Sequence, residues 1–125
     1  MRIDETQKMI NDYFGVMAAH GDFSQFYAED VTWIMIDAGV ETRGAAAVRD
    51  YVVALHGQMS DVHTHRIAVS EGAACLEGDC INVQKTDAPR IAYCVVYDLA
   101  DNRITAMRCY GTFGAMVSQI QPADS

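Results

Sequence analysis

The chain has 125 residues, half of them hydrophobic, and its 17 acidic residues outnumber nine basic ones to give a formal net charge of −8. This is the size of one domain with a substantial core, so we expect a single domain over residues 1–125. The negative charge would repel nucleic acid and anionic membrane surfaces, so we expect neither as a partner. The start of the chain is polar and no apolar run approaches the roughly 20 residues of a membrane span, so we expect a cytoplasmic protein.

The first predicted element is an amphipathic helix that ends at Gly21. Asp4 and Gln7 have the spacing of a capping box, and apolar residues then recur at helical intervals. Gly21 suits a left-handed helix end, and Asp22 can accept hydrogen bonds from the free N–H groups of the next helix. A second helix is therefore predicted to follow directly, through Tyr27.

The remaining pattern predicts strands and one further helix. The β-branched run 31–36 predicts a strand, and the helix after Arg43-Gly44 is predicted over 45–55. A period of two then predicts strands over 63–69, 73–85, 90–99 and 103–113, and a frayed tail over 119–125. Hairpins in succession predict an α+β fold in which a curved antiparallel sheet forms a cone-shaped barrel packed on three N-terminal helices.

The four cysteines are predicted to be buried free thiols. No two of them form a Cys-x-x-Cys pair, and each lies in a predicted apolar strand, where cysteine behaves as a small hydrophobic residue. Their spacing does not require a zinc site, so we expect no metal. They are Cys75, Cys80, Cys94 and Cys109.

Several segments carry a family resemblance. Gly21-Asp22-Phe23, the run 26–33 and Arg43-Gly44 with the run 47–51 resemble the first half of the nuclear transport factor 2-like superfamily, SnoaL-like branch. The segments 96–99 and 102–110 are similar to its last hairpin. The resemblance implies one fold that hosts isomerases, cyclases, dehydratases, epoxide hydrolases and members without chemistry, so function depends on the site.

The catalytic positions of two resembling enzyme groups are changed here. Ketosteroid isomerases use a tyrosine, a carboxylate base and a protonated carboxylic acid at positions that correspond to Phe14, Met35 and Cys94. Tyr13 is one helical residue away, about 100 degrees around the axis, and is expected to face elsewhere. Limonene epoxide hydrolases place an aspartate where this chain has Thr112.

Strand alternation nevertheless predicts a cavity. If Met35 points inward, other residues on its strand face do so as well, and the same rule selects inward residues on the later strands. The result is an apolar box suited to a flat hydrophobic or aromatic ligand, and the alternative is that these residues are filled core. The predicted ligand-binding residues are Phe14, Trp33, Met35, Cys94, Val96, Met107, Cys109 and Phe113.

Few polar residues could supply chemistry in such a box. Asp37 and His65 are the candidate acid/base pair, without any cofactor. The alternative for Asp37 is a turn residue, and for His65, as for His63, a core or interface histidine. Glu77 and Asp79 share a strand face that is most simply solvated. His20 and His56 are expected to be partners of helix C-termini.

The sequence therefore leaves three functions open. One is a proton-transferring isomerase, cyclase or dehydratase acting on a small hydrophobic molecule. The second is a non-catalytic binder of such a molecule, which the changed catalytic positions favour, and the third is a dimerisation domain. In each case we expect a homodimer through the outer sheet face, where Arg108, Tyr110 and Thr112 alternate outward.

Overall fold

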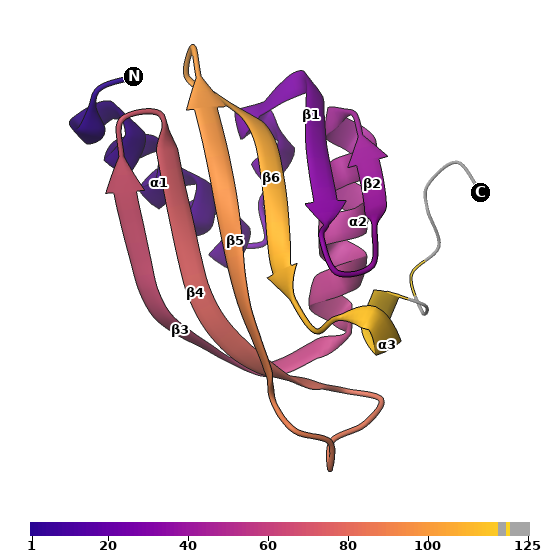
Figure 1. Ribbon diagram of the computed structural model, residues 1–125. Coiled ribbons are helices and arrows are strands. Elements are labelled where there is room, and N and C mark those ends of the chain that lie inside the picture. The colour runs from indigo at the N-terminus through magenta and orange to yellow at the C-terminus, as the bar shows by residue number, and fades with distance from the viewer. Residues whose placement is uncertain (118–119, 121–125) are drawn as a thin grey trace.

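A curved six-stranded sheet carries two long helices on one face in the computed structural model, which describes residues 1–117 and residue 120 (Figure 1). The strand order is β2-β1-β6-β5-β4-β3. The predicted tail over 119–125 lies outside the described residues, except for Ile120. The elements are α1 (Ile3–Ala18), η1 (Phe23–Phe26), β1 (Tyr27–Met35), β2 (Val40–Arg43), α2 (Ala45–Gly57), β3 (Met59–Ser70), β4 (Ala73–Asn82), β5 (Ile91–Ala100), β6 (Arg103–Gly111) and α3 (Gly114–Val117).

The end of α1 is a left-handed turn, but the residue that makes it is not the predicted glycine. His20 has φ 60° and the Gly21 N–H donates to the Val16 carbonyl at 2.9 Å, which closes the helix. Gly21 is required for space, because an added Cβ would lie 2.9 Å from the Val16 side chain. Asp22 then accepts from the Ser24 N–H at 3.0 Å, as predicted.

The sheet is mixed, which corrects the prediction of an antiparallel one. β1 pairs with the short strand β2 in a hairpin, but it also pairs in parallel with β6, where Trp33 lies beside Met107. α2 carries the chain back across the sheet, so the four following strands return and the last of them meets β1 in the same direction. This contact joins segments about 75 positions apart, and local patterns carry no signal for it.

Two further predictions about the architecture were wrong. The sheet does not close into a barrel, because β2 and β3 lie at its two ends as edge strands. The predicted second helix is only the four-residue 3₁₀ turn η1, after which the chain enters β1 at Tyr27. Two long helices, α1 and α2, therefore cover the inner face of an open curved sheet (Figure 1).

Alternation along the strands separates two faces. In β5 and β6, Val95 pairs with Cys109 and Tyr97 with Met107, and all four side chains are buried against the helices. The neighbours of these residues point to the opposite, outer face, where Val96 pairs with Arg108. The core thus lies wholly on the helix side of the sheet.

Candidate ligand-binding cavity

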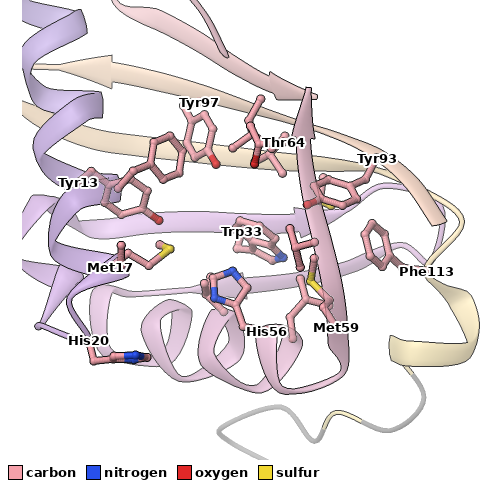
Figure 2. Close-up of a pocket in the computed structure, with 18 residues that line it drawn as sticks. Tyr13, Met17, His20, Trp33, His56, Met59, Thr64, Tyr93, Tyr97 and Phe113 are labelled. Atoms are coloured by element: carbon pink, nitrogen blue, oxygen red, sulfur yellow. The ribbon is translucent and has the colours of Figure 1, made fainter. Parts of the chain in front are cut away.

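A cavity of about 660 Å³ lies between the inner face of the sheet and the two helices (Figure 2). Both helices and strands β1, β3, β4, β5 and β6 contribute to its walls, and Phe113 adds a residue beyond the last strand. Its volume is in the range of small-molecule sites, about 300–1,000 Å³. The lining residues are Tyr13, Phe14, Met17, Ala18, His20, Trp33, Val52, Leu55, His56, Met59, Val62, Thr64, Leu76, Tyr93, Val95, Tyr97, Cys109 and Phe113.

Tyr13 brings a hydroxyl group to the cavity, although it was expected to face elsewhere. Its ring stands 5.2 Å from that of Phe14 and 6.1 Å from that of Tyr97, so both α1 aromatics reach the wall together. The hydroxyl is 2.8 Å from the Tyr27 hydroxyl. Consecutive positions point about 100 degrees apart around a helix, but these two rings are large enough to reach the same cavity from both directions.

The tyrosine and cysteine groups of the wall are held in their neutral forms. Burial raises the pKa of Tyr13 and of Tyr97 well above 10.0, and it raises the pKa of Tyr93 to about 12. Burial likewise raises the pKa of the Cys109 thiol to about 12. These groups offer hydrogen bonds near neutral pH and carry no charge.

His56 reaches the cavity from the last turn of α2. Val48, Val52 and His56 are four residues apart and share one helix face, and the two valines are buried. Figure 2 shows the imidazole projecting into the cavity. His56 as a residue is exposed, so it lies at an open part of the cavity, and desolvation of its imidazole by the surrounding wall lowers its pKa from 6.5. The imidazole is neutral at pH 7.

His20 is the second histidine of the wall. It occupies the left-handed turn that ends α1, with φ 60°, a conformation that residues other than glycine rarely adopt. Both His20 and His56 were expected only as partners of helix C-termini. For His56, the four-residue spacing from Val52 was the signal that indicated a place in the wall.

Four of the predicted ligand-binding residues line the cavity: Phe14, Trp33, Cys109 and Phe113. Met35 and Met107 are fully buried beside it. The Trp33 Nε1–H donates to Met35 Sδ at 3.0 Å, and the Tyr13 hydroxyl lies 4.0 Å from Met107 Sδ. These two thioethers support the wall.

Cys94 and Val96 lie on the other face of the sheet. Their cross-strand partners are Tyr110 and Arg108, both on the outer face, whereas Val95 is the lining residue between them. In β5 the prediction therefore chose the wrong set of alternate residues as the inward ones. Tyr93, Val95 and Tyr97, which do point inward, were missed for this reason. Cys75 and Cys94 are only partly buried, unlike Cys80 and Cys109, and all four thiols are free.

Asp37 lies outside the cavity lining and has a structural role. It lies in the exposed turn between β1 and β2, and its Oδ2 accepts from the Phe113 N–H at 2.9 Å. This contact fixes the segment that follows β6. The Phe113 ring packs on Tyr93 with centroids 5.6 Å apart and passes over Gly111, where an added Cβ would lie 2.9 Å from it.

His65, the other candidate for acid/base chemistry, also lies outside the lining. Its Nε2 is hydrogen-bonded to the Asp79 carboxylate, which the Arg90 Nε contacts at 2.5 Å. His63 belongs to the same group, since its Nδ1 is 3.6 Å from Asp79 Oδ1. Register shifts in β3 at this point turn both histidines to the outer face. Catalytic roles for Asp37 and His65 remain predictions.

Two other kinds of site are absent from the described residues, 1–117 and 120. Within them, no group of His, Cys, Asp and Glu is arranged to hold a metal ion. No helix in this part of the chain has the length and apolarity needed to cross a membrane.

Comparison with known proteins gives the family. The sequence model of the SnoaL-like domain matches residues 10–107, most of the chain. The chain belongs to the SnoaL-like domain family. No protein with a curated description matches it in sequence.

Solved structures share this SnoaL-like fold at low identity. A steroid delta-isomerase from Pseudomonas aeruginosa is 13% identical with a TM-score of 0.77, over 92% of this chain and 90% of that one. An NTF2-like protein from Burkholderia xenovorans LB400 is 14% identical with a TM-score of 0.74, over 95% and 97%. A de novo designed protein with a curved β-sheet is 15% identical with a TM-score of 0.74, over 95% and 96%. The fold is thus common to an isomerase and to a designed protein, so it does not decide the activity.

Proposed function

We propose that this SnoaL-like protein binds a small, uncharged, largely apolar ring compound in its internal cavity. The observation that carries the proposal is the composition of the wall. Six of its residues are aromatic, and no Asp, Glu, Lys or Arg is among the described lining residues. Aromatic faces stack on planar rings, whereas a charged ligand would lose its hydration without gaining a charged partner.

The volume supports a ligand site in preference to filled core. Protein interiors pack at high density, with few voids larger than a water molecule, and a space of about 660 Å³ far exceeds such voids. The neutral hydroxyls and His56 provide a few polar contacts that would orient a ring compound. By its name, the Pseudomonas aeruginosa relative acts on a steroid, a compound of this class.

Trp33 provides the measurement, because it is the sole tryptophan of the chain and lines the cavity. Titration with naphthol, a neutral planar probe, should change its fluorescence in a saturable way. Naphthalene sulfonate, which has the same rings and a charge, should bind at least about tenfold more weakly, equivalent to about 1.4 kcal/mol. Equal affinity for both probes, or no saturable binding of naphthol, would contradict the proposal.

A pair of threonine variants tests the location. Thr64 lines the cavity yet keeps an exposed side chain, so Thr64→Glu should add a carboxylate to the apolar wall without unfolding the domain. Naphthol binding should weaken at least about tenfold. Thr86→Glu, in the exposed segment between β4 and β5, adds the same charge elsewhere and should leave binding unchanged.

A further inference from the structure

Hydroxyl groups and an imidazole approach the cavity from different sides. Tyr13 of α1 and Tyr97 of β5 direct their hydroxyls into it, and His56 enters from α2 (Figure 2). The Tyr13–Tyr27 contact can be donated by either hydroxyl. When Tyr27 donates, the Tyr13 hydroxyl has only the weak acceptor Met107 Sδ at 4.0 Å for its own proton, so a bound oxygen can take its place, and the first bond polarises the second.

We propose that His56 is a general base that removes a proton from the bound ring compound, while Tyr13 and Tyr97 hydrogen-bond to the atom on which negative charge develops. The inference rests on the proposed function and adds a substrate class: neutral planar compounds with a weakly acidic C–H or O–H group. The hydroxyls and the base would contact different parts of one molecule, as proton transfer requires.

Besides His56, the described wall carries three tyrosines, one cysteine and one further histidine. On β5 and β6 these groups are Tyr93, Tyr97 and Cys109; Tyr13 is on α1, and His20 is in the turn that follows it. The tyrosines and the thiol stay uncharged near neutral pH, because burial raises the pKa of each. Trp33 of β1 and the lining residues of β3 and β4 do not titrate. The tyrosines and the thiol therefore do not account for a pH dependence near neutrality, and the His56 and His20 variants assign it.

A nitrobenzisoxazole is a suitable reporter, because it is a neutral, planar bicycle that reacts in one base-catalysed step. An imidazole nitrogen takes the ring C–H proton, and the released electron pair forms a nitrile as the N–O bond breaks. The oxygen leaves as a coloured phenolate, and the imidazolium returns its proton to solvent. The step needs no oxidant, reductant or cofactor.

The wild-type protein should accelerate this reaction over an equal concentration of free imidazole. His56→Gln and His56→Ala should lower kcat/KM at least about tenfold, and added imidazole should partly restore the rate of the alanine variant. His63→Gln is the matched control, since His63 lies on the outer face beside Asp79 and not in the cavity wall, and it should keep the rate. His20→Asn tests the other histidine of the wall, since asparagine tolerates the left-handed backbone at that position. Thermal melts of all variants check that they are folded.

The pH profile provides a readout that a structural role would not change. A neutral base acts above its pKa, so kcat/KM should rise with pH and level off, with its midpoint below 6.5 because burial lowers the pKa of His56. Measurements between about pH 5 and about pH 8 cover this transition. In the His56 variants the transition should disappear.

Binding and rate separate this inference from the proposed function. If naphthol binds but the His56 variants retain the wild-type rate, or the profile midpoint is unaffected by them, the base assignment is overturned and the binding function stands. Loss of the rate in His20→Asn instead would overturn it in favour of the other histidine. If naphthol does not bind, the proposed function itself fails.

Discussion

The two faces of one sheet have opposite chemistry, although the same strands build both. Val95 and Tyr97 face an uncharged cavity, whereas their neighbours Val96 and Asp98 face outward beside Arg108. Charged side chains concentrate on the outer face, where water screens them. Side-chain alternation alone therefore separates a site from a surface, and a shift of one residue exchanges the two.

On strands β3 to β6, the ion pairs of the outer face form two groups in the described part of the chain. Arg108 Nη1 contacts Asp98 Oδ2 at 2.7 Å, and Arg90 bridges Asp79 and Asp61 near the open ends of β3 to β5. Exposed ion pairs of this kind contribute little stability individually. Most of the stability must instead come from the apolar inner face and the helices packed on it.

The largest difference between the faces should appear in the pair Val95→Glu and Val96→Glu. Val95 is 5% exposed, so a glutamate there places an unpaired charge in the core, which costs several kcal/mol against a total stability of about 5–15 kcal/mol. The glutamate at position 96 would lie beside Arg108 on the outer face. Urea unfolding should find Val95→Glu largely unfolded and Val96→Glu folded. Equal destabilisation would mean that the two faces do not differ as described.

The second test concerns what covers the outer face. We predict a homodimer through this face, where Tyr110 is 43% exposed and offers a large contact area with a polar tip. Light scattering at micromolar concentration should give twice the chain mass of 13.7 kDa. Tyr110→Glu should halve that value, because it brings two like charges together across a symmetric interface. A monomeric wild type would refute the prediction.

The smallest effect should come from the Asp79 group. The hydrogen bonds from His65 and then Arg90 lower the pKa of Asp79 below 3.8. The carboxylate thus contributes stability that is present above this value and lost as pH falls through the lower, folded pKa. Asp79→Asn should be slightly less stable at neutral pH and should lose less stability on acidification. Urea midpoints across this acidic window measure both, with Asp87→Asn in the β4–β5 segment as control.

Residue patterns predicted most of the elements and their order, but they could not assign the faces of β5. Ala92, Cys94 and Val96 are as apolar as Val95 and its inward neighbours, so alternation shows which residues share a face without showing which face is buried. Cys94 was assigned to the inner face by its correspondence to a family position. That assignment was wrong, and the hydrophobic pattern of β5 gave no information that could have corrected it. In β6, by contrast, polar Arg108 and apolar Met107 make the choice plain, and the prediction of Met107 and Cys109 as inward was confirmed.

Other features were missed because their causes are not local. The parallel pairing of β1 with β6 depends on chain segments distant in sequence, and β2 is only four residues long, below the length at which a period of two is distinct. Of the aromatic wall, Phe14 of α1 and Trp33 of β1 were predicted, whereas Tyr13 was not. His56 was within reach of helical spacing, but its exposure to a cavity required the fold.

The hydrogen bond between Asp37 and Phe113 fixes one end of the cavity from a turn that does not itself line it. Phe113 belongs to no strand, so a smaller or larger residue there would change how long a molecule fits without altering the alternation of the sheet. The Asp37 side chain, in the turn between β1 and β2, holds the Phe113 backbone in place from outside the cavity. Because Phe113 is fully buried, a smaller residue there would enlarge the cavity at a cost in stability, so ligand size and stability are linked at this position.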